Sequence, residues 1–108
     1  MIYEWRVYEI MPGKRNELHE RFTAHTLRLF AKHGIKVVGF WENLIGGATN
    51  TLYYMLAFDS VAERERTMAD FQNDPEWKSA FVSSEKNGPL TLKVYNMLLQ
   101  PTYYSPMK

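Results

Sequence analysis

The chain has 108 residues, of which 45% are apolar and 23% are charged, and its 13 Lys and Arg nearly balance its 12 Asp and Glu. A chain of this length builds one core, so we expect a single domain over residues 1–108, without the basic field that nucleic acids or anionic membranes need. The sequence contains no cysteine, which excludes disulfides, thiolate nucleophiles and cysteine-ligated metals.

The first predicted element is a strand over Ile2–Ile10, a segment rich in β-branched and aromatic residues. Alternation places Glu4 and Arg6 on one face and Tyr3, Trp5 and Val7 on the other. These charges do not fit the apolar centre of a signal peptide, and no apolar run in the chain reaches membrane-spanning length. We therefore expect a cytoplasmic protein with no membrane partner.

A helix is predicted from Lys14 to His33, after Pro12 and Gly13 end the first strand. Leu18, Phe22 and Leu29 recur in it at intervals of four and seven residues, which is the spacing of one helical face. Gly34 comes after two basic residues, as is typical where a helix ends in a left-handed glycine.

A β-hairpin comes next, with strands predicted over residues 35–45 and 51–58 and a turn at Gly46, Gly47 and Asn50. Ser60 and Glu63 then form a capping box that starts a second helical segment at about residue 61.

This second segment contains a break. Asp74 followed by Pro75 is a second N-cap pattern, so the helix is expected to break near Asn73 and to restart. A turn at residues 87–89 ends it, and residues 90–100 form the last strand. The order β-α-β-β-α-β predicts a ferredoxin-like α+β fold, an antiparallel sheet with both helices on one face.

The sequence predicts no polar face for this sheet. Residues 51–58 and 90–100 are apolar at both odd and even positions, whereas a sheet with one wet face alternates apolar and polar residues. Something must cover the second face, and a second copy of the same sheet is the simplest cover. We therefore expect a homodimer formed through the sheet.

An ordered set of short motifs resembles the NIPSNAP family over nearly the whole chain. These motifs are Glu4-Trp5-Arg6-Val7-Tyr8, Pro12-Gly13, Phe22, His25-Thr26, Gly34-Ile35, Gly39-Phe40-Trp41, Asp59-Ser60, Asp74-Pro75-Glu76-Trp77 and the stretch from Leu99 to Ser105. The resemblance implies a ferredoxin-like subunit that assembles as a dimeric α+β barrel. It implies no reaction, because the family has no settled enzymatic activity. Families on the same barrel include cofactor-independent monooxygenases, which is an analogy of fold only.

Four residues are candidates for a small-molecule site: Arg6, Tyr8, His25 and Trp41. His25 lies seven residues after Leu18, so an α-helix would turn it toward the sheet, as a hydrogen-bonded core histidine or as a polar group in a pocket between helix and sheet. Arg6 and Tyr8 share a strand face and could bind an anion, although an ordinary ion pair with Glu4 is the simpler interpretation.

Trp41 would be a core residue by default. Gly39, two residues before it on the same strand face, could however leave space for an aromatic ligand to stack on its ring. His19, His25 and His33 lack a metal-binding spacing, so we expect no metal site, and nothing in the sequence indicates a cofactor.

Two functions remain open from these residues. The first is a homodimeric protein that binds a small ligand or a partner without turnover. The second is a cofactor-independent, monooxygenase-like enzyme for a small aromatic or acyl molecule, with His25 as acid or base and Arg6 as anion anchor. The size of the space between helices and sheet separates them.

Overall fold

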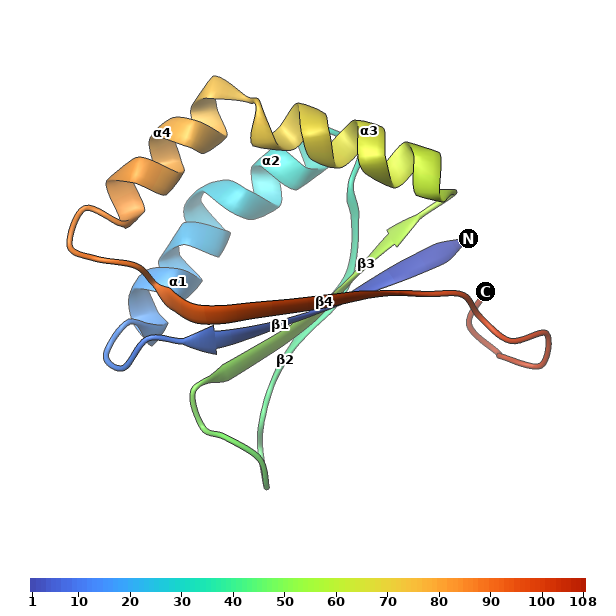
Figure 1. The fold of residues 1–108 in the computed structure, drawn as a ribbon, viewed down its shortest axis with the longest axis horizontal. Coiled ribbons are helices and arrows are strands. Elements are labelled where there is room, and N and C mark those ends of the chain that lie inside the picture. Colours follow the sequence, from blue (N-terminus) through green and yellow to red (C-terminus); the bar gives the residue numbers. More distant parts are fainter.

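A computed structural model describes residues 1–108 as a four-stranded antiparallel sheet with every helix on one of its faces (Figure 1). The predicted ferredoxin-like α+β fold is therefore confirmed. The elements are β1 (Ile2–Ile10), α1 (Arg15–Arg21), the π-helical turn η1 (Phe22–Thr26), α2 (Leu27–Lys32), β2 (Lys36–Glu42), β3 (Thr51–Phe58), α3 (Val61–Gln72), α4 (Pro75–Ser84) and β4 (Thr91–Leu99). None of the helices is both long and apolar enough to cross a membrane.

The strands are ordered β2-β3-β1-β4, so the first strand of the chain is central and pairs with both β3 and β4. Arg6 lies opposite Tyr54 on one side and Asn96 on the other. These three residues and Phe40 of β2 form one row across the sheet, on the face that the helices cover.

The hairpin differs from its prediction at one end. Strand β2 stops at Glu42, three residues before the predicted Ile45. Gly46 and Gly47 both adopt positive φ angles in the connection, and the Asn43 side chain donates a hydrogen bond to the carbonyl of Ala48. The connection therefore includes Leu44 and Ile45, which the sequence analysis placed in the strand because they are apolar.

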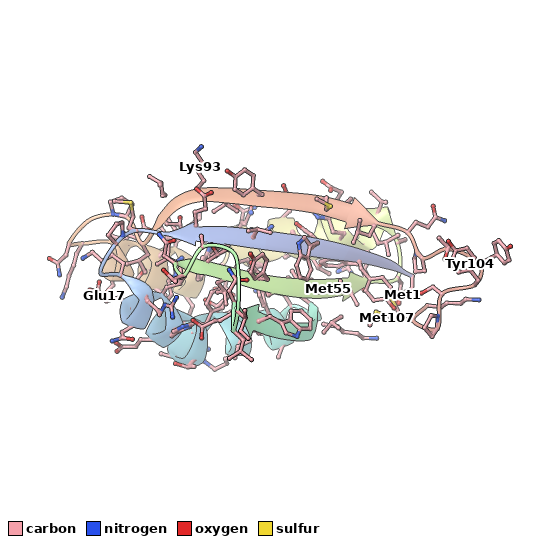
Figure 2. The ribbon with its side chains drawn as sticks, turned by 90° about the horizontal axis from the view of Figure 1, so that it is seen from below. Met1, Glu17, Met55, Lys93, Tyr104 and Met107 are labelled. Carbon is pink, nitrogen blue, oxygen red and sulfur yellow. The ribbon has the colours of Figure 1, made fainter.

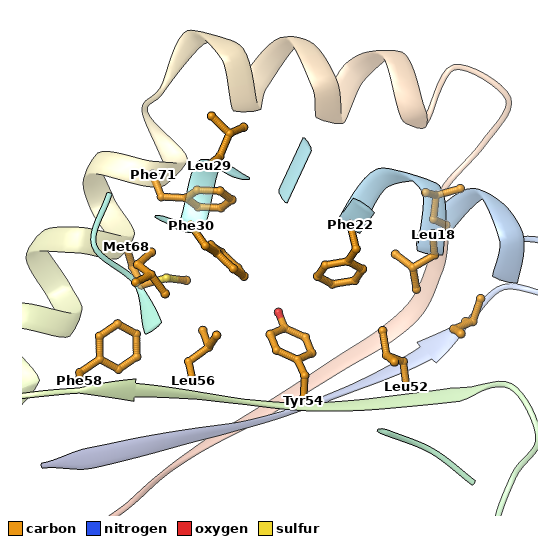
Figure 3. Close-up of a cluster of buried hydrophobic side chains, with 13 residues drawn as sticks. Leu18, Phe22, Leu29, Phe30, Leu52, Tyr54, Leu56, Phe58, Met68 and Phe71 are labelled. Atoms are coloured by element: carbon orange, nitrogen blue, oxygen red, sulfur yellow. The ribbon is translucent and has the colours of Figure 1, made fainter. Parts of the chain in front are cut away.

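The core lies between the sheet and the helices. Alternate residues of β3 point toward the helices and meet Leu18, Phe22, Leu29 and Phe30 from the first helical segment and Met68 and Phe71 from α3 (Figure 3). Tyr54 stands in the middle of this layer, only 1% exposed, with its hydroxyl directed toward the helices. An apolar layer thus contains one buried hydroxyl group.

The first helical segment is not a regular α-helix. The Leu27 backbone N–H bonds to the carbonyl of Phe22, five residues earlier, so the segment contains a π turn with one additional residue. An additional residue rotates the rest of the helix by about 100°. Thr26, 3% exposed, takes the inward position, and His25 lies half-buried at the edge. The prediction that His25 faces the sheet was wrong for this reason.

Both predicted N-caps are present. The Ser60 hydroxyl accepts a hydrogen bond from the Glu63 backbone N–H at 3.1 Å, and Asp74 accepts one from the Glu76 backbone N–H at 2.8 Å. The second cap holds α4 at an angle to α3, as Figure 1 shows. This change of direction lets α4 extend over the β1–β4 side of the sheet.

The opposite face of the sheet has no covering element. Figure 2 views the strands from that side, with the helices behind them. Its side chains are mostly large and apolar or aromatic, and Met97 and Trp41 are 53% and 46% exposed. We call this surface the open face; its residues are Tyr3, Trp5, Val7, Trp41, Tyr53, Met55, Tyr95, Met97 and Leu99.

Candidate functional site

A partly open cavity of about 550 Å³ lies between the sheet and the helices. It is lined on the sheet side by residues of β1, β3 and β4. On the helix side it is lined by residues of α3, α4 and the first helical segment. Its wall is mainly aromatic and aliphatic, including Phe22, Phe30, Phe71, Trp77, Phe81 and Val94. A volume of this size is typical of a small-molecule site. We call it the helix–sheet cavity.

The charged residues that line this cavity are all basic: Arg6, Arg21 and Lys78. No carboxylate is among the lining side chains. The cavity therefore combines an apolar wall with positive charge, a combination that suits an apolar molecule with an acceptor or an anionic group.

Arg6 and Tyr8 of β1 and Tyr54 of β3 form a hydrogen-bonded group in the cavity. The Arg6 Nε donates to the Tyr54 hydroxyl at 2.6 Å, and the two tyrosine hydroxyls are 2.8 Å apart. The Arg6 Nη2 lies 3.4 Å from the Tyr8 hydroxyl. Burial, and after it the neighbouring Tyr8, raises the pKa of Tyr54 well above its usual value of 10.0, so the Tyr54 hydroxyl acts as a neutral hydrogen-bonding group at neutral pH.

Glu4 holds Arg6 from the other side. It is fully buried, and it accepts hydrogen bonds from Arg6 Nη1 at 2.7 Å, from Asn96 Nδ2 at 3.0 Å, and from Arg64 Nε and Nη2 at 3.0 and 3.1 Å. Burial alone would raise the pKa of Glu4, but the hydrogen bonds from Arg64, Asn96 and Arg6 outweigh it and lower the pKa below 4.5. The carboxylate is thus ionised and fixes the direction of the Arg6 guanidinium.

Arg21 is the residue of the cavity that the sequence interpretation missed. It is 6% exposed and comes from the last turn of α1. Its position three residues after Leu18 and next to Phe22 was the available signal, because that spacing places a charged residue on the buried side of the helix. Tyr54 was also missed, because it occupies one of the alternating apolar positions of β3 and was counted as an apolar residue there.

The structure brings only two of the four predicted site residues together. Arg6 and Tyr8 line the helix–sheet cavity, as their shared strand face predicted. Arg6 also forms the ion pair with Glu4 that was the simpler interpretation of its role. This pair lies beneath the helices and not on the sheet surface. His25 borders a separate polar pocket of about 330 Å³ between α1 and α4.

Trp41 lies on the open face, on the other side of the sheet from Arg6. Its ring centroid is 5.8 Å from that of Trp5, which stacks on Tyr53 at 5.7 Å. A Cβ at Gly39 would meet the Trp41 ring at 3.0 Å, so the space beside the glycine is already filled by this ring. A ligand therefore cannot stack beside Gly39 as the sequence interpretation considered, and Trp41 instead borders a separate pocket of about 290 Å³ together with Leu27 and Phe40.

Comparison with known proteins identifies the family. The NIPSNAP family profile matches residues 3–106, almost the whole chain. This chain belongs to the NIPSNAP family. It is 32% identical over 82 residues to human protein NipSnap homolog 3A, and 31% identical over 80 residues to mouse protein NipSnap homolog 3B. The matches cover 76% and 74% of this NIPSNAP chain but only 32% of each relative, so it spans about a third of their length.

Solved structures show the same fold. A NIPSNAP family protein of unknown function from Agrobacterium tumefaciens aligns with a TM-score of 0.86 at 24% identity, covering 100% of this chain and 94% of that one. A putative antibiotic biosynthesis monooxygenase from Nitrosomonas europaea aligns with a TM-score of 0.66 at 7% identity, covering 95% of this chain and 100% of that one. At these identities the likeness concerns the fold alone.

Proposed function

We propose that this NIPSNAP protein binds a small molecule with a large apolar part in the helix–sheet cavity. The observation that supports the proposal is a cavity of about 550 Å³ with an aromatic wall and a hydrogen-bonding group formed by Arg6, Tyr8 and Tyr54. A few convergent polar groups in an apolar pocket are the usual composition of a ligand site. The buried Glu4 and its partners hold these groups in place before any ligand arrives, which lowers the entropic cost of binding.

The size of the cavity is compatible with the catalytic alternative, but the residue assigned to its chemistry lies elsewhere. The acid or base assigned to it was His25, which borders the separate polar pocket. The monooxygenase-like neighbour shares the fold at 7% identity, so its name carries no substrate to this chain. Binding without turnover is therefore the function that we propose.

Thermal unfolding in the presence of apolar probes tests the binding function. We expect a naphthalene or medium-chain acyl probe to stabilise the protein by about 2.7 kcal/mol when its concentration is about 100 times its dissociation constant. Val94→Trp should abolish this stabilisation, because Val94 lines the cavity from β4 and a larger ring there would fill it. His25→Ala is the matched control and should leave it unchanged.

Two outcomes would count against the proposal. If Val94→Trp and the wild type respond alike to every stabilising probe, the probes bind elsewhere. If no probe of this size stabilises the wild type, the cavity does not serve as a ligand site.

We also propose that a second copy of the chain covers the open face. The supporting observation is the continuous set of apolar and aromatic side chains across all four strands, on the side without helices. Such a surface on an isolated subunit would promote aggregation, and two-fold homodimers are the commonest way in which proteins bury one.

A further inference from the structure

Arg21 occupies an unusual position at the α4 side of the helix–sheet cavity. Its guanidinium carbon lies 5.5 Å from the centre of the Trp77 ring and 5.2 Å from that of Phe81. Both aromatic residues line the cavity and neither borders the polar pocket. The cation is thus held against the apolar wall, away from bulk water.

Only one nitrogen of this guanidinium, Nη1, has hydrogen-bond partners. Nη1 lies 3.2 Å from the Ser84 hydroxyl and 3.3 Å from the Glu85 Oε2. Nε is buried and has no hydrogen-bond partner, the only buried side-chain nitrogen or oxygen in the protein in this condition. A buried donor without an acceptor destabilises the fold, because it has lost its hydrogen bonds to water. Such a donor at the wall of a cavity indicates that an acceptor is missing.

The free edge of Arg21 points away from its partners. In a planar guanidinium, the Nε–Nη2 edge lies on the side opposite Nη1. Ser84, which receives Nη1, borders the polar pocket and not the helix–sheet cavity. Arg21 itself lines both spaces, and its Nε–Nη2 edge lies on the side of the guanidinium opposite Ser84 and Glu85.

Another arginine of the same chain shows which group this edge can bind. Arg64 donates from Nε and Nη2 to the two carboxylate oxygens of Glu4, at 3.0 and 3.1 Å. Two parallel N–H donors fit a carboxylate in this way, which makes the bidentate pair both strong and selective. Arg21 offers an identical pair of donors with no carboxylate opposite them.

We propose that the ligand of the helix–sheet cavity carries a carboxylate, toward which Arg21 turns its Nε–Nη2 edge on binding, since Nε is buried in this structure, while the apolar part of the ligand packs between Trp77, Phe81 and the sheet. This assignment rests on the proposed binding function and specifies its ligand class as apolar monocarboxylates, with an aromatic or acyl body. The exclusively basic set of charged lining residues supports it independently.

Calorimetric titration with a matched pair of probes tests this assignment. The pair is 2-naphthylacetate and its uncharged amide, which have nearly the same shape. We expect the wild-type chain to bind the acid at least tenfold more tightly than the amide at neutral pH. Arg21→Lys keeps the charge but loses the two parallel donors, so this preference should fall below threefold while binding of the amide stays the same.

Two further variants complete the design. Glu85→Gln removes the charge that partly neutralises Arg21, so it should tighten binding of the acid severalfold and leave the amide unaffected. Arg28→Gln is the matched control, because Arg28 is an exposed arginine that pairs with Glu76 outside the cavity. It should change neither affinity.

Each alternative outcome has one meaning. Equal binding of acid and amide by the wild type, or an undiminished preference in Arg21→Lys, overturns the carboxylate site and leaves the cavity as a site for neutral molecules. Should Arg21→Lys fail to fold, an unchanged acid affinity in Glu85→Gln overturns it instead. If neither probe binds and the thermal screen also finds no ligand, the proposed function fails together with this assignment.

Discussion

Glu4 is the residue on which the polar part of the core depends. It is 0% exposed and receives hydrogen bonds from β1, α3 and β4, through Arg6, Arg64 and Asn96. A buried carboxylate is tolerated only when its charge and its lone pairs are met in this way. The same contacts fix Arg6 beside the two tyrosines of the cavity, so one acid couples stability to the geometry of the site.

We expect Glu4→Gln to lower the free energy of unfolding by about 3 to 5 kcal/mol at about pH 7, because it removes the buried counter-charge that Arg6 and Arg64 share. Since folding lowers the pKa of Glu4, its stabilisation is complete above about pH 4.5 and is lost as the pH falls through the lower, folded-state pKa. The difference between variant and wild type should therefore shrink toward about pH 3. Urea unfolding at the two pH values measures it.

Glu65→Gln serves as the control, because Glu65 also pairs with Arg64 but is 63% exposed. It should change stability by less than about 1 kcal/mol at either pH. A Glu4→Gln variant that loses as much stability in acid as at neutral pH would show that packing, and not charge, dominates at this position.

The residues of this site could be predicted from the sequence only in part. The two-residue period of a strand is enough to place Arg6 beside Tyr8. Tyr54, which bonds to both of them, and Arg64 and Asn96, which bond to Glu4, come from distant parts of the chain, and no local pattern connects these residues before the sheet register is known. The registers of β1 with β3 and with β4 supply this missing information.

At the level of elements, the order and most boundaries were predicted because local chemistry decides them. The Ser60 and Asp74 caps mark the starts of α3 and α4, and β3 has the predicted limits Thr51–Phe58. The π turn was not predicted, because residues 14–33 have the pattern of one helix whether or not an additional residue is present. The misplacement of His25 is a consequence of that single residue.

The π turn makes a deletion prediction. Removing Ala24, an exposed residue inside η1, should restore a regular α-helix and keep Thr26 and the subsequent core residues in place. The free energy of unfolding should then change by no more than about 1 kcal/mol. Chemical unfolding monitored by circular dichroism measures this change.

Removing Ala69 is the matched control, since it is an exposed alanine in the regular helix α3. This deletion rotates the next turn by about 100° and takes Phe71 out of the core, which should cost about 3 to 5 kcal/mol. Equal losses for the two deletions would mean that the additional residue of η1 is itself needed for packing.

At the level of the whole molecule, the sheet has two apolar faces, and the helices cover only one of them. Met55 and Met97 lie in one row of the open face, on either side of Trp5. The sequence alone could not assign either methionine to a face, because alternation defines two sets of residues but not which set the helices cover. Only the contacts of α1 to α4 decide that.

Met97→Asp should weaken the proposed dimer by on the order of 3 kcal/mol, roughly a hundredfold in dissociation constant, because it places a carboxylate without a partner in the interface. Met55→Asp should act in the same direction. Sedimentation across a range of protein concentrations distinguishes dimer from monomer. Val61→Asp is the control, at an exposed position in the first turn of α3 on the helix side, where an acid is favourable.

A wild-type chain that sediments as a monomer at micromolar concentration would contradict the proposal, and so would Asp variants that remain dimers as stable as the wild type. In the first case another partner must cover the open face.

The central place of β1 also has a consequence for synthesis. A ribosome makes β1 before the other three strands, yet one of its two edges pairs with β4, the last of the four to emerge. Glu4 likewise receives the Asn96 amide only at that stage. Until β4 pairs, the second edge of β1 is free and Glu4 lacks the hydrogen bond from Asn96, so a stalled or truncated product is exposed to strand-to-strand association at β1. Pairing of β4 covers the β1 edge and completes the hydrogen bonds of Glu4 in the same step.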